Sequence, residues 1–149
     1  MNVIIKTAKT HDLNDISKLF DAYRVFYKQE SDINLAKNFL KKRIENSESV
    51  IFFAIDESGQ YLGFTQLYPI FSSVSAQRTW LLNDLYVDNK ARGLGVGTKL
   101  LNQAKEYAKQ TGAKGVALET EITNTGAQKL YEQLNYEKDK EHFHYFLSV

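Results

Sequence analysis

Residues 80–98 read WLLNDLYVDNKARGLGVGT and carry the pattern that decides the fold. The apolar residues from Thr79 to Val87 predict a strand, and the helical spacing of apolar residues from about Gly95 to Gln110 predicts a helix. Between them stand three alternating glycines, Gly93, Gly95 and Gly97. Glycine lets the backbone turn tightly and approach a ligand closely. Because the first turn of a helix leaves N–H groups unpaired and attracts negative charge, the junction and Arg92 predict a site for the phosphates of a phosphate-bearing cofactor.

Two common phosphate loops do not fit this stretch. A dinucleotide fingerprint that starts at Gly93 needs glycine or alanine at position 98, where Thr98 stands. A P-loop needs Gly-Lys followed by Ser or Thr, whereas the chain reads Gly97-Thr98-Lys99. A glycine-rich loop that only makes a tight turn remains the alternative.

The N-terminal half predicts a strand and two helices. Val3–Ile5 suggest a short strand, and the apolar positions that follow Thr10 recur at helical spacing as far as Tyr27. A second helix is expected after Ser31 or Asp32. Its inner side should carry Leu35, Phe39, Leu40 and Ile44.

The remaining segments alternate between strands and helices. Strands are expected at Val50–Ile55, Tyr61–Phe71, Thr79–Val87, Val116–Thr120 and His142–Leu147, and a second short helix at Asn124–Leu134. Gly63 and Pro69 should mark a bulge or bend, and Gly112 should cap the helix that precedes it. The expected order is βααβββαβαβ, an α+β (mixed α/β) fold with a mixed sheet, in a single domain over residues 1–149.

Composition excludes several classes of function. A formal net charge of +1 gives no bulk electrostatic case for nucleic acid as a partner. The chain has no cysteine, which excludes disulfides, thiolate metal sites and a cysteine nucleophile. No apolar stretch approaches the ~18 residues that a membrane span needs. We therefore expect a cytoplasmic protein without a membrane partner.

Three motifs in order resemble one enzyme family. Arg92-Gly93-Leu94-Gly95-Val96-Gly97 fits R-x-x-G-x-G and resembles the acetyl-coenzyme A loop of the GNAT family of N-acetyltransferases. Asn124 to Tyr136 resemble the family's N-x-x-A-x-x-L-Y-E-x-x-G-F segment, and Asn83 to Asp88 resemble the strand before the loop. The usual Gly-Phe is here Asn135-Tyr136, and asparagine tolerates the left-handed conformation.

This resemblance implies acetyl-coenzyme A as the cofactor and a GNAT-like acyl-CoA N-acyltransferase fold. The backbone near Leu85, Tyr86 and Val87 would polarise the thioester carbonyl and bind the pantetheine arm, which Asn124 would also contact. The implied pyrophosphate donors are Gly93, Gly95, Val96, Gly97 and Thr98, with Arg92 beside them.

The resemblance also implies an acid for the leaving thiol. Tyr131 matches the family tyrosine that points at the coenzyme sulfur, and a phenol with a pKa near ~10 can donate a proton there. The structural alternative places Tyr131 in an apolar helix stripe with Ala127, Leu130 and Leu134.

The base that takes the amine proton is less clearly marked. A free alkyl amine has a pKa near ~10.4, so a base or a water chain helps to recruit its neutral form. Asp84 is the first candidate, to bind or deprotonate the amine. In the polyamine acetyltransferases that this strand resembles, a Glu commonly precedes the equivalent Asp, but here that residue is Asn83. Glu119, Glu121 and water stay open.

The acceptor amine is expected beside the first two helices and residues 66–70. Tyr23 and Tyr27, with Phe26, offer aromatic faces for an amine, although such a stripe also suits core packing, as do Trp80 and Tyr68. The acceptor would be a primary amine of a small molecule, most simply, or of a lysine or N-terminus. His142 and His144 are two ligands without a third, so no metal is expected. The alternatives are a non-catalytic acetyl-coenzyme A sensor and an interaction module. In the interaction module Phe143–Phe146 would make the dimer contacts, and an exposed apolar sheet edge there would suit the homodimer that the family resemblance implies.

Overall fold

The computed structural model describes residues 2–149, which divide into two compact parts, one ending at Leu118 and one spanning Glu119–Val149. In the first part a short 3-10 helix, Thr10–Asp12, precedes the first α-helix, and a second, Asn89–Ala91, precedes the third. The other elements of the first part are β1 (Ile4–Thr7), α1 (Leu13–Phe26), α2 (Ile33–Glu45), β2 (Val50–Ile55), β3 (Tyr61–Ser72), β4 (Gln77–Val87), α3 (Val96–Gln110) and β5 (Val116–Ala117). The second part contains α4 (Thr125–Gln133).

The five strands form one mixed sheet in the order β1-β2-β3-β4-β5. The first four strands pair antiparallel, whereas β4 and β5 pair in parallel. The strand expected over Val116–Thr120 is only two residues long, and it pairs with Trp80 and Leu81 alone. Consequently the second half of β4 has no paired β5 residue beside it.

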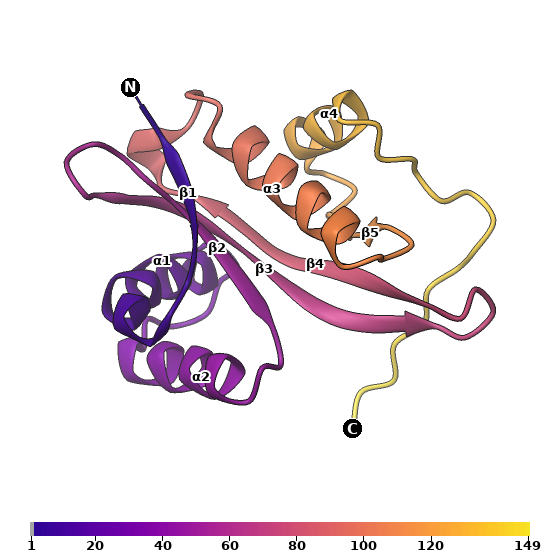
Figure 1. Ribbon diagram of the computed structural model, residues 1–149, viewed down its shortest axis with the longest axis horizontal. Helices are drawn as coiled ribbons and strands as arrows, with labels where there is room; N and C mark the ends of the chain where they lie inside the picture. Colours follow the sequence, from indigo (N-terminus) through magenta and orange to yellow (C-terminus); the bar gives the residue numbers. More distant parts are fainter. Residues whose placement is uncertain (1) are drawn as a thin grey trace. The chain divides into compact units, whose positions relative to one another are not determined.

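Helices cover both faces of this sheet, with α1 and α2 on one face and α3 on the other (Figure 1). The alternation of β2 explains the two layers. Ile51 and Phe53 belong to the core cluster under α1 and α2, and the Phe52 ring lies 5.4 Å from the Tyr107 ring of α3. The helix residues of the core cluster are Leu13, Ile16, Leu19, Phe20, Ala36 and Leu40.

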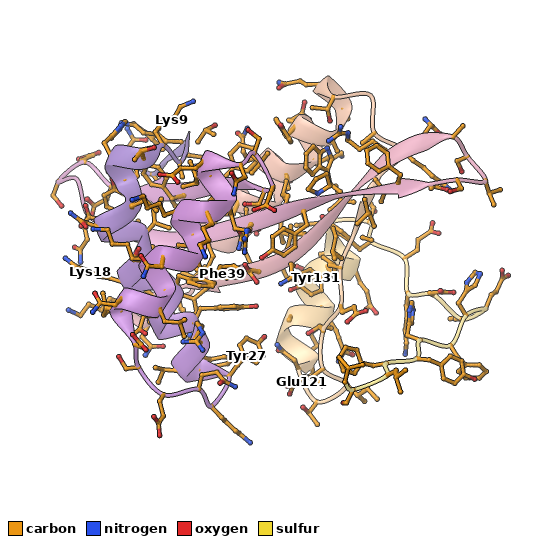
Figure 2. All side chains as sticks on the ribbon, turned by 90° about the horizontal axis from the view of Figure 1, so that it is seen from below. Lys9, Lys18, Tyr27, Phe39, Glu121 and Tyr131 are labelled. Atoms are coloured by element: carbon orange, nitrogen blue, oxygen red, sulfur yellow. The ribbon has the colours of Figure 1, made fainter. Side chains whose placement is uncertain are left out.

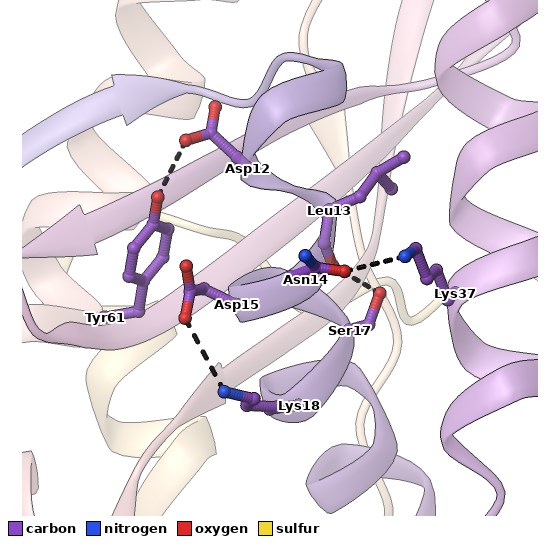
Figure 3. Close-up of polar contacts among 8 residues, drawn as sticks. All are labelled: Asp12, Leu13, Asn14, Asp15, Ser17, Lys18, Lys37 and Tyr61. Atoms are coloured by element: carbon purple, nitrogen blue, oxygen red, sulfur yellow. Dashed lines mark hydrogen bonds and ion pairs between the residues drawn. The ribbon is translucent and has the colours of Figure 1, made fainter.

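The start of α1 is fixed by polar contacts to β3 and α2 (Figure 3). The Tyr61 hydroxyl donates to Asp12 Oδ1 (2.7 Å), and Lys37 Nζ donates to Asn14 Oδ1 (2.7 Å). Lys18 and Asp15 form an exposed ion pair at 3.8 Å. Because these contacts hold the N-terminal half of α1, the orientation of its C-terminal half, which carries Tyr23, is also fixed.

Each α-helix of residues 2–149 is followed, two positions after its last residue, by a residue with positive φ. These residues are Lys28, Ser47, Gly112 and Asn135, and in each case the next residue donates its N–H to a carbonyl five positions earlier. This is the Schellman arrangement that satisfies the last helical carbonyls. The expected cap at Gly112 is confirmed, and Asn135 adopts the left-handed turn of the usual glycine with φ 69°.

Several expectations are confirmed and others are corrected. The fold class, the mixed sheet and the order βααβββαβα are as expected. The expected final strand at His142–Leu147 is wrong, because within residues 2–149 this segment pairs with no other strand. Its large apolar side chains are highly exposed, from Leu147 at 84% to Tyr145 at 93%. In α2 the inner side is formed by Ala36 and Leu40, whereas Leu35 and Phe39 are exposed. None of the helices in residues 2–149 is long and apolar enough to cross a bilayer.

Strands β3 and β4 approach closely at Gly63. This residue pairs on its other side with Ala54 of β2, next to the register shift between Ala54 and Ile55. Pro69 pairs regularly with Trp80, so the expected bend there is absent from this pairing. A Cβ at Gly63 would lie 2.7 Å from the Tyr86 carbonyl oxygen. We expect Gly63→Ala to lower the free energy of unfolding in urea by about 1 to 3 kcal/mol, because the backbone must shift.

The matched control is Gly115→Ala, since a Cβ there meets no atom within 4 Å. This change should alter the free energy of unfolding by no more than about 0.5 kcal/mol. Equal urea midpoints for the two variants would contradict the close approach.

Candidate active site

The glycine-rich loop presents main-chain amides at the start of α3. Gly93 and Gly95 have φ of 77° and 79°, in the left-handed region that favours glycine. The first amide that donates along α3 is that of Lys99, to the Gly95 carbonyl (3.1 Å). Within residues 2–149, the N–H groups of residues 93–98 make no hydrogen bond to a protein acceptor. These amides are thus available to an anion at the positive end of the helix.

The surroundings of these glycines are open. A Cβ at Gly93 or Gly95 would meet no atom within 4 Å. The protein therefore leaves space directly above the loop backbone, and the positive φ angles rather than packing exclude larger residues. A diphosphate needs such open, donor-rich backbone, so the loop fits the coenzyme that the motif predicted.

The edge of β4 adds donors next to this loop. The Asp88 N–H donates to the Leu62 carbonyl on β3 (2.8 Å). Because polar backbone groups alternate along an antiparallel pair, Leu85 and Val87 direct their N–H and C=O groups to the opposite edge, where β5 is not paired. Tyr86 instead directs its backbone toward β3, and its ring lies 6.3 Å from that of Tyr23.

A β-bulge in β4 lies next to Asp84, whose carboxylate is on the same strand as Leu85 and Val87. Gln66 pairs with Asp84 and Leu67 with Leu82, so Asn83 is the extra residue. Asp84 is only 3% exposed. Its Oδ1 accepts a hydrogen bond from Asn83 Nδ2 (2.8 Å) and its Oδ2 accepts one from Gln66 Nε2 (2.5 Å).

The environment of Asp84 shifts several pKa values. Burial raises the pKa of the Asp84 carboxyl, while hydrogen bonds from Gln66 and Asn83 and the nearby Tyr23 hydroxyl oppose part of the rise. Burial and the charge of Asp84 raise the pKa of Tyr23 well above its usual range and that of Tyr68 to about 12. Both phenols therefore keep their protons at neutral pH and can donate hydrogen bonds.

Gln66 and Ser49 belong to this site, although the sequence did not assign them a role. Gln66 is fully buried, and its Oε1 accepts a hydrogen bond from Ser49 Oγ (2.7 Å). This bond orients the amide so that its NH2 group faces Asp84. No local motif marks the pair, because the contact between Gln66 and Asp84 depends on the register of β3 and β4.

Arg92 lies between the loop and α1. Its Nε donates to the Val87 carbonyl (3.0 Å), and its guanidinium carbon lies 5.6 Å from the Phe26 ring and 5.7 Å from the Tyr86 ring. The side chain thus ties the end of β4 to the end of α1.

The aromatic residues expected at the acceptor site are brought together. The Tyr23 and Tyr27 rings are 5.0 Å apart, and the Tyr27 and Phe26 rings are 5.2 Å apart. The Tyr23 hydroxyl donates to the Asn83 carbonyl (3.4 Å), which places it beside Asp84. Trp80 belongs to the core and not to the acceptor site, which confirms the alternative interpretation as core packing. It is 3% exposed and packs on Tyr107 of α3.

The second part of the chain carries the downstream motif. The Asn124 side chain caps α4 by accepting from the Ala127 N–H (3.2 Å). Tyr131 extends from α4 (Figure 2), with its ring 5.9 Å from that of Tyr136. The Glu121 carbonyl accepts a hydrogen bond from Gln128 Nε2, and Glu119 and Glu121 are both exposed. Within residues 2–149, no group of three potential metal ligands gathers.

Comparison with known proteins agrees with these motifs. The model of the acetyltransferase (GNAT) family matches residues 13–136. The uncharacterized N-acetyltransferase YhfO of Bacillus subtilis (strain 168) is 53% identical over 97% of both chains. The D-amino-acid N-acetyltransferase HPA3 of Saccharomyces cerevisiae is 29% identical over 93% of this chain and 87% of that protein. The crystal structure of a probable acetyltransferase has a TM-score of 0.93 at 41% identity, covering 98% of this chain and 97% of that one.

Proposed function

This chain belongs to the acetyltransferase (GNAT) family and is an acyltransferase enzyme, and from that premise we propose that it moves the acetyl group of acetyl-coenzyme A to a primary amine. The observation that carries the proposal is the run of N–H groups at residues 93–98 without protein acceptors, next to the open edge of β4. In the proposed complex, the amides of Gly93, Gly95, Val96, Gly97 and Thr98 bind the pyrophosphate. Leu85 and Val87 bind the pantetheine arm, and so does Asn124.

The proposed chemistry needs two proton transfers. Acetyl-coenzyme A supplies an acetyl thioester, which an amine attacks directly. Asp84 accepts, directly or through water, the proton that the amine loses as its nitrogen–carbon bond forms. Tyr131 donates a proton to the sulfur that departs as the carbon–sulfur bond breaks. Exchange with solvent then returns both side chains to their starting states.

Tyr131→Phe tests the proposed acid. We expect kcat to fall about tenfold, a modest loss because a thiol with a pKa near ~8.5 leaves with little help. The KM for acetyl-coenzyme A should stay the same, since the ring remains. The measurement is steady-state thiol release, with Tyr136→Phe as the control for loss of a neighbouring phenol. An unchanged kcat in Tyr131→Phe would remove this residue from the mechanism.

Gln66→Leu tests whether the buried amide tunes Asp84. The variant keeps the volume of the side chain but removes a donor that lowers the pKa of Asp84. The acid limb of kcat/KM against pH should therefore move to higher pH. Ser49→Ala, which only frees the Gln66 amide to rotate, should move the limb less and in the same direction. A pH profile that coincides with that of the unchanged protein in both variants would contradict the tuning role.

The acceptor is the least specified part of the proposal. We propose a small-molecule amine at Tyr23, Tyr27 and Asp84, with a lysine or N-terminal amine as the alternative. A relative with near full-length similarity is named for D-amino acids, which are small acceptors. The aromatic rings beside Asp84 support a small organic amine, because they offer an apolar surface.

The direct test of this function is thiol release from acetyl-coenzyme A with a panel of amines. We expect release that depends on both the amine and the enzyme, with a matching acetylated product by mass spectrometry. Coenzyme binding without release on a broad panel would instead indicate a sensor.

The remaining proposals concern the whole chain. We propose that residues 1–149 act as one N-acetyltransferase domain, because the family match at residues 13–136 spans both compact parts. We also propose a cytoplasmic location, where acetyl-coenzyme A is available, and a homodimer. The exposed segment with Phe143, Tyr145 and Phe146 supports the dimer, since contiguous exposed aromatic rings usually mark an interface.

A further inference from the structure

The end of the chain exposes a row of large apolar side chains. Within residues 2–149, the chain beyond α4 forms no helix or strand (Figure 1). We define residues 142–148 as the C-terminal arm, in which four large side chains are at least 84% exposed: Phe143, Tyr145, Phe146 and Leu147. In an extended chain every second side chain points to the same face, so positions 143, 145 and 147 form one apolar row. The arm thus has the side chains of a strand and lacks only an edge to pair with.

The outer edge of β1 offers such a pairing site. Within residues 2–149, β1 is an outermost strand of the sheet and pairs with β2 alone. The Ala8 N–H donates to the Ile51 carbonyl (2.8 Å), and the direction of the backbone groups alternates along an antiparallel pair. The N–H and C=O groups of Ile5 and Thr7 therefore point away from the sheet, where an added strand can bind them.

A hollow beside this edge suits large side chains. It lies between β1 and α3 and has a volume of about 240 Å³. Its apolar side is formed by Val3 and Ile5, and its polar side by four residues of α3: Lys99, Asn102, Gln103 and Glu106. At ~30 Å³ per water molecule, the hollow has room for about eight waters, so an aromatic ring fits. A strand added to β1 would place every second side chain on this face of the sheet.

Length and area favour β1 of a second copy as the partner of the arm. The arm pairs with no strand of its own chain within residues 2–149. Of the two outermost strands, β1 has four residues and β5 only two, so β1 offers the longer edge. Three aromatic side chains bury about 450–750 Å² per arm. Two arms exchanged about a two-fold axis would bury about 900–1,500 Å², which reaches the size of a stable interface.

We propose that the C-terminal arm of each copy adds as a strand to the outer edge of β1 of a second copy. This inference rests on the proposed homodimer and names the two surfaces that form it. The arm backbone binds the free N–H and C=O groups of Ile5 and Thr7. The row of Phe143, Tyr145 and Leu147 covers the hollow between β1 and α3. On the other face of the sheet, Phe146 meets Ile4, which is 50% exposed.

Proline at an outward-facing edge position tests this pairing. Ile5→Pro removes an N–H that points away from β2, so the sheet of each copy should persist. We expect the dissociation constant of the dimer, measured by analytical ultracentrifugation, to rise about tenfold or more, which corresponds to the loss of about one net hydrogen bond and its side-chain contacts. A thermal melt confirms that the variant is folded.

The matched control is Val116→Pro at the opposite edge of the sheet. Because the Trp80 N–H donates to the Gly115 carbonyl, the Val116 N–H points away from β4. This variant should change the dissociation constant by no more than about twofold. A dimer that survives Ile5→Pro but not Val116→Pro would move the arm to β5 and overturn the inference, while the homodimer stands. A monomeric unchanged protein would overturn the homodimer itself.

Crosslinking tests the same contact without proline. The chain has no cysteine, so a single cysteine can be introduced into each of two protein populations. After Ile4→Cys and Phe146→Cys proteins have been mixed and have exchanged subunits, a short bismaleimide should join the two chains. Val74→Cys, at the exposed turn between β3 and β4, is the control partner and should not be joined to Phe146→Cys. Crosslinking at Val74→Cys and not at Ile4→Cys would contradict the proposed pairing.

Discussion

Gly95→Asp is expected to lower the affinity for acetyl-coenzyme A by about 100-fold or more. The side chain would project into the open space over the loop, where the proposed pyrophosphate lies, and its carboxylate would repel the phosphates. Gly95 also has φ of 79°, so a side chain strains the backbone that presents the amides. Calorimetric titration of acetyl-coenzyme A measures the effect directly.

Gly112→Asp is the matched control for this variant. Gly112 has φ of 66° and equally open surroundings, but it lies at the other end of α3. Both variants should therefore lose similar stability, and only Gly95→Asp should lose affinity. Equal affinity for the coenzyme in the two variants would show that the loop does not hold the phosphates.

Asp84→Asn is expected to lower kcat/KM at neutral pH by about 100-fold or more, because it removes the proposed base while keeping the shape of the side chain. The residual rate should rise with pH, as more of the amine is neutral in solution. In the unchanged enzyme the rate should fall as pH drops through the raised pKa of Asp84.

The same substitution should have the opposite effect on stability. Burial raises the pKa of Asp84 in the folded protein above its unfolded value of 3.8, so the folded state binds this proton more tightly. The stability from this group is therefore fully present below pH 3.8 and is lost as pH rises through the folded pKa. At neutral pH, Asp84→Asn should raise the free energy of unfolding, and the gain should shrink in acid.

Thermal melts of the unchanged protein and of Asp84→Asn, recorded from acid to neutral pH, test this expected dependence of stability on pH. A variant that is slower and more stable at neutral pH is what a buried catalytic carboxylate predicts. Loss of both activity and stability would instead identify Asp84 as a structural residue held by Gln66 and Asn83.

Local signals in the sequence account for much of the fold. The apolar run Val50–Ile55 predicted β2 with its observed bounds, and the sequence predicted α1, α2, α3 and α4 within a few residues. The ends of α3 and α4 could be predicted from the sequence because glycine, as at Gly112, and asparagine, as at Asn135, favour positive φ. Lys28 and Ser47 adopt the same conformation without such a preference, so the ends of α1 and α2 depend on the hydrogen bonds of the folded chain.

The failures have a common physical cause. The aromatic, alternating residues 142–147 have high strand propensity, but a strand also needs an edge to pair with. Similarly, the sequence singled out Asp84 but not Gln66, since only the β3–β4 register and the bulge at Asn83 join them. The conformation of the loop at Gly93 and Gly95 was predictable because glycine adopts positive φ readily.

The most direct test of the central claim is an NMR titration of ¹⁵N-labelled protein with coenzyme A, using pantetheine as the ligand that lacks the diphosphate. We expect the amide signals of residues 93–98 to shift strongly with coenzyme A and only weakly with pantetheine. The amides of Leu85 and Val87 should shift with both ligands. Coenzyme A that binds without moving the signals of residues 93–98 would contradict the assignment of these main-chain amides to the diphosphate.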